Sequence, residues 1–329
     1  MVGAYKISIR SKRVKYEFLV RRQITIISGN SATGKTTLVD MVRAYNNYGT
    51  DSGIALQCAK KCKVLEGADW EQRLADIDDC IIFIDEGNKF TGQPDFARKI
   101  RHSNNYYVLI TRERLSNIPY SVNEIYGLKN SGKYERVTQT FNETYNLYDA
   151  FSTGMVRHPQ MVITEDSNSG FQFFESVGRK RNFSCRHADG KSNIKKFITS
   201  DNTQNTLLVV DGAAFGPEMH DVTAKIKKFR NYTLYTPESF EWIILKSGLI
   251  PDPPGININK ILESPQNYVE TTQYFSWERY FSSLLRLATS GRSGLVYSKE
   301  QLPDAYKQEP AVKKILNVMD KIEFDDTGH

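Results

Sequence analysis

The feature that most constrains the fold is a glycine-rich turn between a short apolar run and an amphipathic segment. Residues 24–28 (Ile-Thr-Ile-Ile-Ser) are rich in β-branched side chains, which is typical of a strand. From about Lys35 to Tyr45, apolar residues recur at helical spacing. The turn between them reads Gly29-Asn-Ser-Ala-Thr-Gly34-Lys35-Thr36 and fits G-x-x-x-x-G-K-[ST]. A strand, this turn and a helix, in that order, predict a loop whose backbone amides surround a phosphate chain.

This P-loop assigns an expected role to each of its polar residues. Lys35 is expected to reach the β- and γ-phosphates, and Thr36 to bind the Mg²⁺ that accompanies them. No N/TKxD stretch for guanine recognition is present in the sequence, so ATP is favoured over GTP. The predicted ATP-binding residues are Gly29, Asn30, Ser31, Ala32, Thr33, Gly34, Lys35, Thr36 and Thr37.

A second apolar run, residues 80–84, ends in the pair Asp85-Glu86. Asp85 at the carboxyl end of a buried strand is expected to hold the same Mg²⁺ through water. Glu86, the next residue, is expected to orient and deprotonate the attacking water. The alternative for Glu86 is a carboxylate that caps the N-terminus of a helix.

A P-loop followed by this acidic pair resembles the additional-strand, catalytic-glutamate class of P-loop ATPases, which is AAA-like. The resemblance implies ATP hydrolysis and a polar γ-phosphate sensor at the end of a further strand. Residues 106–110 form such a run, and Thr111 follows it. Arg112 and Arg114 are candidates to stabilise transition-state charge, the alternative being ordinary surface ion pairs.

Acidic residues also follow three predicted strands in the second half of the chain, residues 161–164, 206–210 and 232–235. Parallel strands end at one edge of a sheet, so these carboxylates are expected to converge and hold one or two Mg²⁺, or Mn²⁺, ions. Two such metals stabilise the attacking and leaving oxygens of a phosphodiester transfer. The predicted ligands are Glu165, Asp211, Glu238 and Glu241.

The order of these acids over residues 158–245 resembles the TOPRIM domain of topoisomerases, primases and OLD-family nucleases. An ATPase followed by a TOPRIM domain is the OLD arrangement, which implies an ATPase-nuclease of phage defence. The sequence departs from the family pattern twice, with Ser169 and Ala213 where the pattern has acids. Asp166, Glu238 and Glu241 are the candidates to replace them. The alternatives are a TOPRIM fold without catalysis, or an unrelated α/β domain with helix-capping acids.

The length of 329 residues and the alternation of strands with helices predict two successive α/β domains. We expect a P-loop ATPase domain with a parallel sheet over residues 1–152 and a smaller TOPRIM-like domain over 153–250. After the breaker cluster Pro251-Asp-Pro-Pro-Gly255, a helical C-terminal extension is expected over 251–329.

Composition limits the class of protein further. Hydrophobic residues make up 40% of the chain, and no run approaches the roughly 18–20 apolar residues needed to span a bilayer, so a cytoplasmic protein without membrane contact is expected. The four cysteines lack the partners of a zinc site and are expected to be incidental thiols. The net charge is +6, and the first 22 residues hold seven basic side chains, a stripe that either contacts phosphates or is simply a solvated strand face.

These patterns leave three hypotheses. The first is an ATPase whose nucleotide state controls a TOPRIM-like module acting on nucleic acid. The second is an ATP-driven sensor that forms a homo-oligomer or binds a partner protein of a defence complex, with no chemistry in its C-terminal half. The third is a small DNA-dependent motor ATPase.

Overall fold

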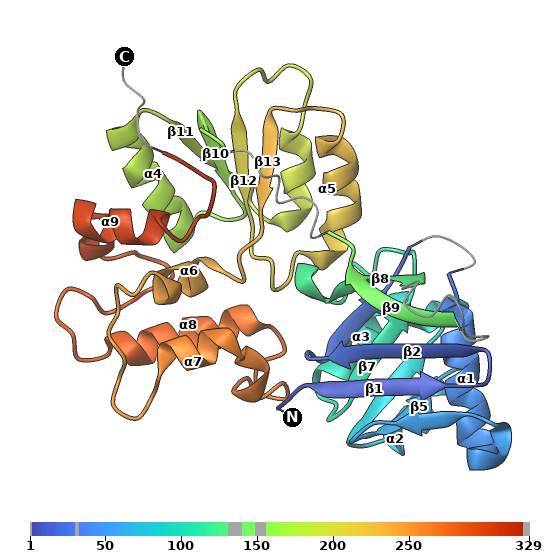
Figure 1. Ribbon diagram of the computed structural model, residues 1–329. Helices are drawn as coiled ribbons and strands as arrows, with labels where there is room; N and C mark the ends of the chain where they lie inside the picture. The colour runs from blue at the N-terminus through green and yellow to red at the C-terminus, as the bar shows by residue number, and fades with distance from the viewer. Residues whose placement is uncertain (1, 30–32, 131–139, 149–155, 325–329) are drawn as a thin grey trace. The chain divides into compact units, whose positions relative to one another are not determined.

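The computed structural model describes residues 2–29, 33–130, 140–148 and 156–324 (Figure 1). The chain forms two compact units. The first unit comprises residues 1–149 and 266–275, and the second unit comprises residues 150–265 and 276–329. The C-terminal helical region is therefore divided between the units, and most of it belongs to the second. No helix in the described ranges is long and apolar enough to cross a membrane.

The first unit contains a nine-stranded mixed sheet, in the order β4-β1-β2-β9-β8-β3-β7-β6-β5. The strands are β1 Tyr5–Arg10, β2 Val14–Val20, β3 Ile24–Ile27, β4 Ala55–Gln57, β5 Lys61–Val64, β6 Cys80–Ile84, β7 Tyr106–Ile110, β8 Ile125–Asn130 and β9 Thr140–Asn146. Its α-helices are α1 Lys35–Tyr48, α2 Trp70–Ala75 and α3 Pro94–Arg101.

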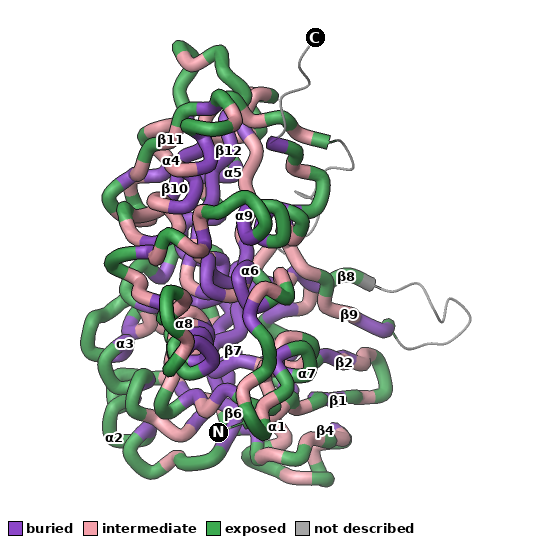
Figure 2. Tube along the Cα trace, turned by 90° about the vertical axis from the view of Figure 1, so that its left-hand side faces the viewer, coloured by how far each residue is buried: buried purple, intermediate pink, exposed green. Residues whose placement is uncertain are grey.

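The prediction of a parallel sheet holds for only part of this unit. Strands β8, β3, β7, β6 and β5 are mutually parallel. Strand β9 returns antiparallel to β8, and it carries the β1–β2 hairpin and β4 at its other side. The centre of the parallel block is buried, since β3, β6 and β7 have no exposed residue, and Figure 2 shows β6 and β7 in purple. Uniform burial explains their continuous apolar sequences.

The nine-stranded sheet curves strongly around α1. Its two edge strands, β4 and β5, are joined by only residues 58–60, and four residue steps span at most about 14 Å. Rings on strands far apart in the sheet order meet accordingly, Phe18 with Phe83 at 6.4 Å and Tyr5 with Tyr106 at 5.2 Å between centroids. The enclosed core includes the apolar face of α1, so the helix that follows the P-loop is held from several sides.

Asn105 directly precedes β7 and stabilises the start of β6. Its side chain is 2% exposed. The carboxamide oxygen accepts a hydrogen bond from the Cys80 backbone N–H at 2.9 Å, and the amide donates to the Ile77 carbonyl at 2.7 Å. These bonds satisfy backbone groups that the ladder leaves unpaired where the strands begin.

The second unit contains a four-stranded parallel sheet, in the order β11-β10-β12-β13. The strands are β10 Met161–Thr164, β11 Ser184–His187, β12 Thr206–Val209 and β13 Tyr232–Tyr235. The helices are α4 Ser169–Arg181, α5 Met219–Ile226, α6 Phe240–Lys246, α7 Ile258–Glu263, α8 Trp277–Thr289 and α9 Glu309–Leu316. Lys191–Phe197 form a 3₁₀ segment between β11 and β12.

The strand order of the second unit reverses between β10 and β12. From β10 the chain passes to β11 on one side, then returns to β12 on the other side and continues to β13. Connections that leave the sheet in opposite directions open a crevice at the carboxyl ends of the two central strands. Glu165 follows β10 and Asp211 lies two residues beyond β12, so both acids stand at this point.

Candidate nucleotide site and acid pocket

The P-loop joins β3 to α1 as the sequence predicts, although its residues 30–32 (Asn30, Ser31 and Ala32) lie outside the described ranges. Gly29 and Gly34 both have positive φ, +112° and +87°. Lys35 is 5% exposed, and its ammonium donates to the Gly29 carbonyl at 3.0 Å and to Thr33 Oγ1 at 3.1 Å. The lysine therefore lies back across its own loop, while Thr36 and Thr37 are exposed at the start of the helix.

Gly34 is required by its surroundings as well as by its backbone angles. The Tyr16 hydroxyl on β2 donates to the Gly34 carbonyl at 2.8 Å. A Cβ atom at position 34 would lie 2.6 Å from that hydroxyl oxygen, closer than real Cβ contacts. Tyr16 is 1% exposed, and burial raises the pKa of its hydroxyl. The N-terminal hairpin, which the sequence does not connect with the P-loop, thus supports the turn into α1.

The predicted catalytic residues of the first unit lie at the ends of neighbouring strands. Strand β7 pairs with β3 on one side and with β6 on the other, so Thr111 and Arg112 follow a strand that lies between the P-loop strand and the strand ending at Asp85. Arg112 Nε lies 3.3 Å from Glu86 Oε1. Thr111 is 7% exposed, and its hydroxyl accepts from the Glu113 backbone N–H at 2.9 Å.

Lys35 interacts electrostatically with Arg112, Glu86 and Asp85. Burial lowers the pKa of its ammonium, and the positive charge of Arg112 lowers it further. Glu86 and Asp85 act in the opposite direction. One lysine, one arginine and two carboxylates therefore influence one another at the edge of the sheet where the P-loop lies. Arg114 is exposed in the loop beyond Arg112.

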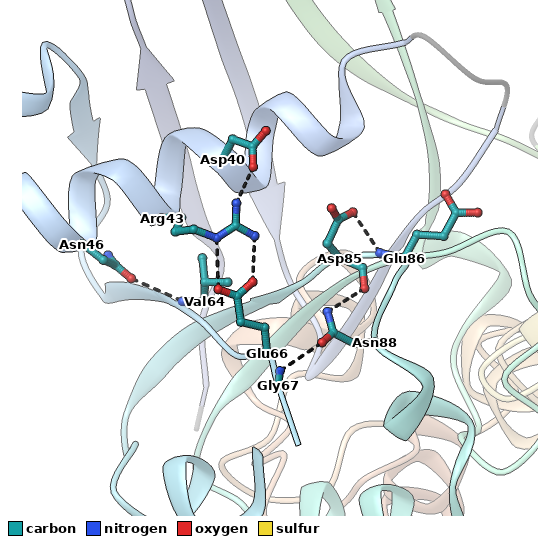
Figure 3. Close-up of polar contacts among 9 residues, drawn as sticks. All are labelled: Asp40, Arg43, Asn46, Val64, Glu66, Gly67, Asp85, Glu86 and Asn88. Atoms are coloured by element: carbon teal, nitrogen blue, oxygen red, sulfur yellow. Dashed lines mark hydrogen bonds and ion pairs between the residues drawn. The ribbon is translucent and has the colours of Figure 1, made fainter. Parts of the chain in front are cut away.

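A polar network ties the Asp85-Glu86 turn to helix α1 (Figure 3). Arg43 on α1 makes a two-pronged contact with Glu66, at 3.1 and 2.7 Å. The next residue, Gly67, donates to Asn88 Oδ1 at 3.3 Å, and the Asn88 amide donates to the Asp85 carbonyl at 3.0 Å. Asp85 Oδ1 accepts from the Glu86 backbone N–H at 2.8 Å, which fixes the turn itself.

In the second unit, three of the four predicted ligands line one pocket. Glu165, Asp211 and Glu241 face it, whereas Glu238 is not among its lining residues. The prediction that Glu238 joins the other acids is therefore not met by this pocket, since Glu238 precedes the Ser239 cap of α6 whereas Glu241 lies in the first turn of the helix. Asp166 also lines the pocket, but both of its oxygens accept from Asn168, at 3.1 and 2.6 Å.

The carboxyls of this acid pocket carry shifted pKa values. Burial raises the pKa of Glu165 to about 7, against a hydrogen bond that it accepts from the Asp211 backbone N–H at 3.3 Å. Burial raises the pKa of Asp211 well above its ordinary value, and the charges of Glu278, Glu165 and Glu241 add to the shift. Burial and neighbouring negative charges therefore both disfavour the ionised forms of these carboxyls.

Sequence reasoning missed one lining residue from the C-terminal region, Lys299, and two residues of that region that contact lining residues, Glu278 and Tyr297. Glu278 on α8 forms an ion pair with Lys299, which lines the pocket. The Tyr297 hydroxyl donates to Glu241 Oε1 at 2.7 Å and lies 2.7 Å from Ser169 Oγ. No local pattern marks these residues, since Tyr297, for example, contacts helices α4 and α6 at positions 128 and 56 residues away.

The candidate metal ligands do not form a completed ion site. Within the described ranges, no group of three or more His, Cys, Asp or Glu side chains is arranged to hold a metal ion. No protein-family model matches the sequence, and no curated protein matches it.

Proposed function

We propose that the first unit binds ATP with Mg²⁺ and hydrolyses it. The observation that carries this proposal is the position of β7 between β3 and β6, which sets Thr111 and Arg112 between the P-loop and the Asp85-Glu86 pair. This order is what the resemblance to catalytic-glutamate ATPases implies. The 3.3 Å contact between Arg112 and Glu86 supports it at the level of side chains.

Each side chain then has a role that its position allows. The Lys35 ammonium, which is bonded to two loop oxygens, would exchange them for oxygens of the β- and γ-phosphates. Thr36 and Asp85 would hold Mg²⁺, which supplies charge neutralisation for the phosphates. Arg112 pairs with Glu86 in this structure, and a γ-phosphate would compete for the guanidinium and leave Glu86 free to accept a proton from water.

Phosphate release from ATP tests the proposal. Lys35→Ala is expected to abolish turnover and to weaken ATP binding. Glu86→Gln is expected to keep ATP binding and to lose about 10²- to 10⁴-fold in turnover, the usual contribution of a general base. Glu71→Gln is the matched control, because Glu71 is an exposed acid of the same unit that pairs with Lys99 at 3.0 Å. Full turnover in Lys35→Ala would exclude the proposal.

We propose further that the nucleotide state of the first unit controls the second unit, a TOPRIM-like module. The reversal of strand order between β10 and β12, which brings Glu165 and Asp211 to one crevice, favours action on nucleic acid. Mg²⁺- or Mn²⁺-dependent cleavage of DNA or RNA that disappears in Asp211→Ala is the expected result. Its absence across metals and substrates would remove cleavage from the proposal.

The neutral residues Ser169 and Ala213 at two expected acid positions favour a second candidate function. In that case the protein is an ATP-driven sensor that assembles with itself or with a partner protein of a defence complex. Size-exclusion chromatography with and without ATP distinguishes the two. A nucleotide-dependent oligomer without cleavage activity supports the sensor, and cleavage by an unchanged monomer contradicts it.

A further inference from the structure

The acid pocket of the second unit already contains a cation from the protein itself. Lys299 lines the pocket beside Glu165, Asp211 and Glu241. Its ammonium is paired with Glu278, and the two side chains are only 24% and 23% exposed. Burial lowers the pKa of Lys299, but Glu241, Glu278 and Asp211 outweigh that effect, so its pKa lies above the ordinary value. The lysine is therefore charged in the pocket at neutral pH.

The backbone around Lys299 is hydrogen-bonded to helix α4, and the ion pair with Glu278 holds its ammonium. The Ser169 N–H donates to the Lys299 carbonyl at 2.9 Å. Gln172, one turn further along α4, donates to the Glu300 carbonyl at 2.7 Å and accepts from the Leu302 N–H at 2.9 Å. The Ser169 hydroxyl adds the contact with Tyr297.

Ser169 is a position at which the sequence departs from the TOPRIM pattern, and it also contacts the segment that carries Lys299. It is 1% exposed and occupies the position where the TOPRIM pattern has an acid. A carboxylate there would face Tyr297 and the Lys299 segment from the same buried position. This chain has the neutral hydroxyl of Ser169 at that position, and Lys299 supplies a positive charge to the pocket.

One acceptor in the pocket remains without a partner. Glu241 is 1% exposed, and its Oε1 accepts from Tyr297, while its Oε2 has no hydrogen-bond partner among the described residues. A buried carboxylate oxygen is costly unless a cation or donor is near. The pocket is therefore built for positive charge, and its geometry does not complete a metal site as it stands.

We propose that the Lys299 ammonium is the resident cation of the acid pocket and that it excludes a divalent cation while it is paired with Glu278. Removal of the ammonium leaves Glu165, Asp211 and Glu241, which line the pocket, and Glu278, the partner of Lys299, without the positive charge of that lysine. Oxygen-rich groups of this kind are what Mg²⁺ and Mn²⁺ prefer. The inference concerns the second unit alone and does not depend on ATP hydrolysis.

Mn²⁺ binding, followed by electron paramagnetic resonance of the free ion and by calorimetry without nucleotide, tests the proposal. All proteins carry Asp85→Asn, so that the Mg²⁺ position proposed in the first unit does not contribute. We expect Lys299→Met to bind Mn²⁺ at least tenfold more tightly than its parent, and Asp211→Asn to remove the gain. Lys299→Arg, which keeps the charge, should behave as the parent does.

Lys195→Met is the matched control, because Lys195 pairs with Asp221 at 2.9 Å in the same unit but does not line the pocket. It should leave Mn²⁺ binding unchanged. Equal affinity in the parent and in a folded Lys299→Met overturns the proposal. So does tight Mn²⁺ binding by the parent that Asp211→Asn abolishes, a result that does not require Lys299→Met to fold.

Discussion

Replacement of Asn105 by alanine should destabilise the first unit by roughly 3 kcal/mol. The substitution leaves the Cys80 N–H and the Ile77 carbonyl without the partners that they have at 2.9 and 2.7 Å. An unsatisfied buried backbone group costs about 1–3 kcal/mol. The Cys80 amide should account for the larger part of the lost stability, because its hydrogen bond is buried. The contact of the Ile77 carbonyl is only partly buried, so that group can reach water.

Urea unfolding monitored by Trp70 fluorescence measures this loss in the right unit. Trp70 stacks on Phe90 at 5.0 Å and is the single tryptophan in the sequence of the first unit. Phenylalanine at positions 242 and 277 in all proteins makes the signal specific, which matters because a chain of two units need not unfold in one step. Mutants are compared by the midpoint and slope of this transition.

Asn117→Ala is the control, since Asn117 makes a single exposed hydrogen bond to the Gly92 carbonyl at 2.8 Å. It should cost less than about 1 kcal/mol. ATP turnover per folded molecule should be unchanged in Asn105→Ala, because Asn105 contacts the start of β6 and Asp85 follows its end. A loss no greater than that of the control would refute the reasoning.

Three further results are expected. Tyr16→Phe removes the hydrogen bond to the Gly34 carbonyl, worth about 1 kcal/mol, and should weaken binding of a fluorescent ATP analogue about fivefold in a titration. Gly34→Ala has to adopt a φ of +87° and meets the Tyr16 hydroxyl, so the same titration should show no binding, and near-normal affinity would contradict the close approach. Burial raises the pKa of Glu165 from 4.5 to about 7, so the folded state holds a proton that the unfolded chain releases. The stability of the second unit should therefore fall by at most about 3 kcal/mol as pH rises from 4.5 to 7, and Glu165→Gln should flatten that fall in urea unfolding at pH 5 and pH 8.

The sequence predicts best four short strands, each a compact apolar or aromatic run. Residues 80–84, 106–110, 161–164 and 232–235 have the expected bounds. Each is a short β-branched or aromatic run with polar or turn-forming residues at both ends, so local pattern alone defines it. Helix α6 over Phe240–Lys246 also has a local signal, because Ser239 caps it through the Trp242 N–H.

Elements defined by their neighbours were harder to predict. Strand β5 alternates lysines with Cys62 and Val64, and it is a strand because it pairs with β6 at the sheet edge. Helix α3 was also missed, although Pro94 at its first position and basic residues in its last turn are recognisable helix signals. The pairing of β9 with β2 brings together residues more than a hundred positions apart, which no local pattern encodes.

The two candidate sites also differ in how far the local sequence defines them. The residues proposed to bind ATP lie on one loop or at the ends of adjacent strands, so motif and spacing were sufficient to select them. The acid pocket depends on Glu278, Tyr297 and Lys299, which reach Ser169, Asp211 and Glu241 through tertiary packing. The acids that follow the strands therefore could not by themselves predict the positive charge that Lys299 brings to the acid pocket.

The course of the chain gives the two units a short covalent link near this pocket. Residues 266–275 belong to the first unit, where the Gly3 N–H donates to the Gln266 carbonyl at 2.6 Å and Arg101 of α3 lies 5.8 Å from the Phe275 ring. Three residue steps, at most about 11 Å of chain, separate Phe275 from Glu278, the partner of Lys299. A nucleotide-dependent shift of α3 would act on a segment that continues directly into α8. The proposed control of the acid pocket by ATP would therefore require two positions of α8 that differ in whether Glu278 reaches Lys299.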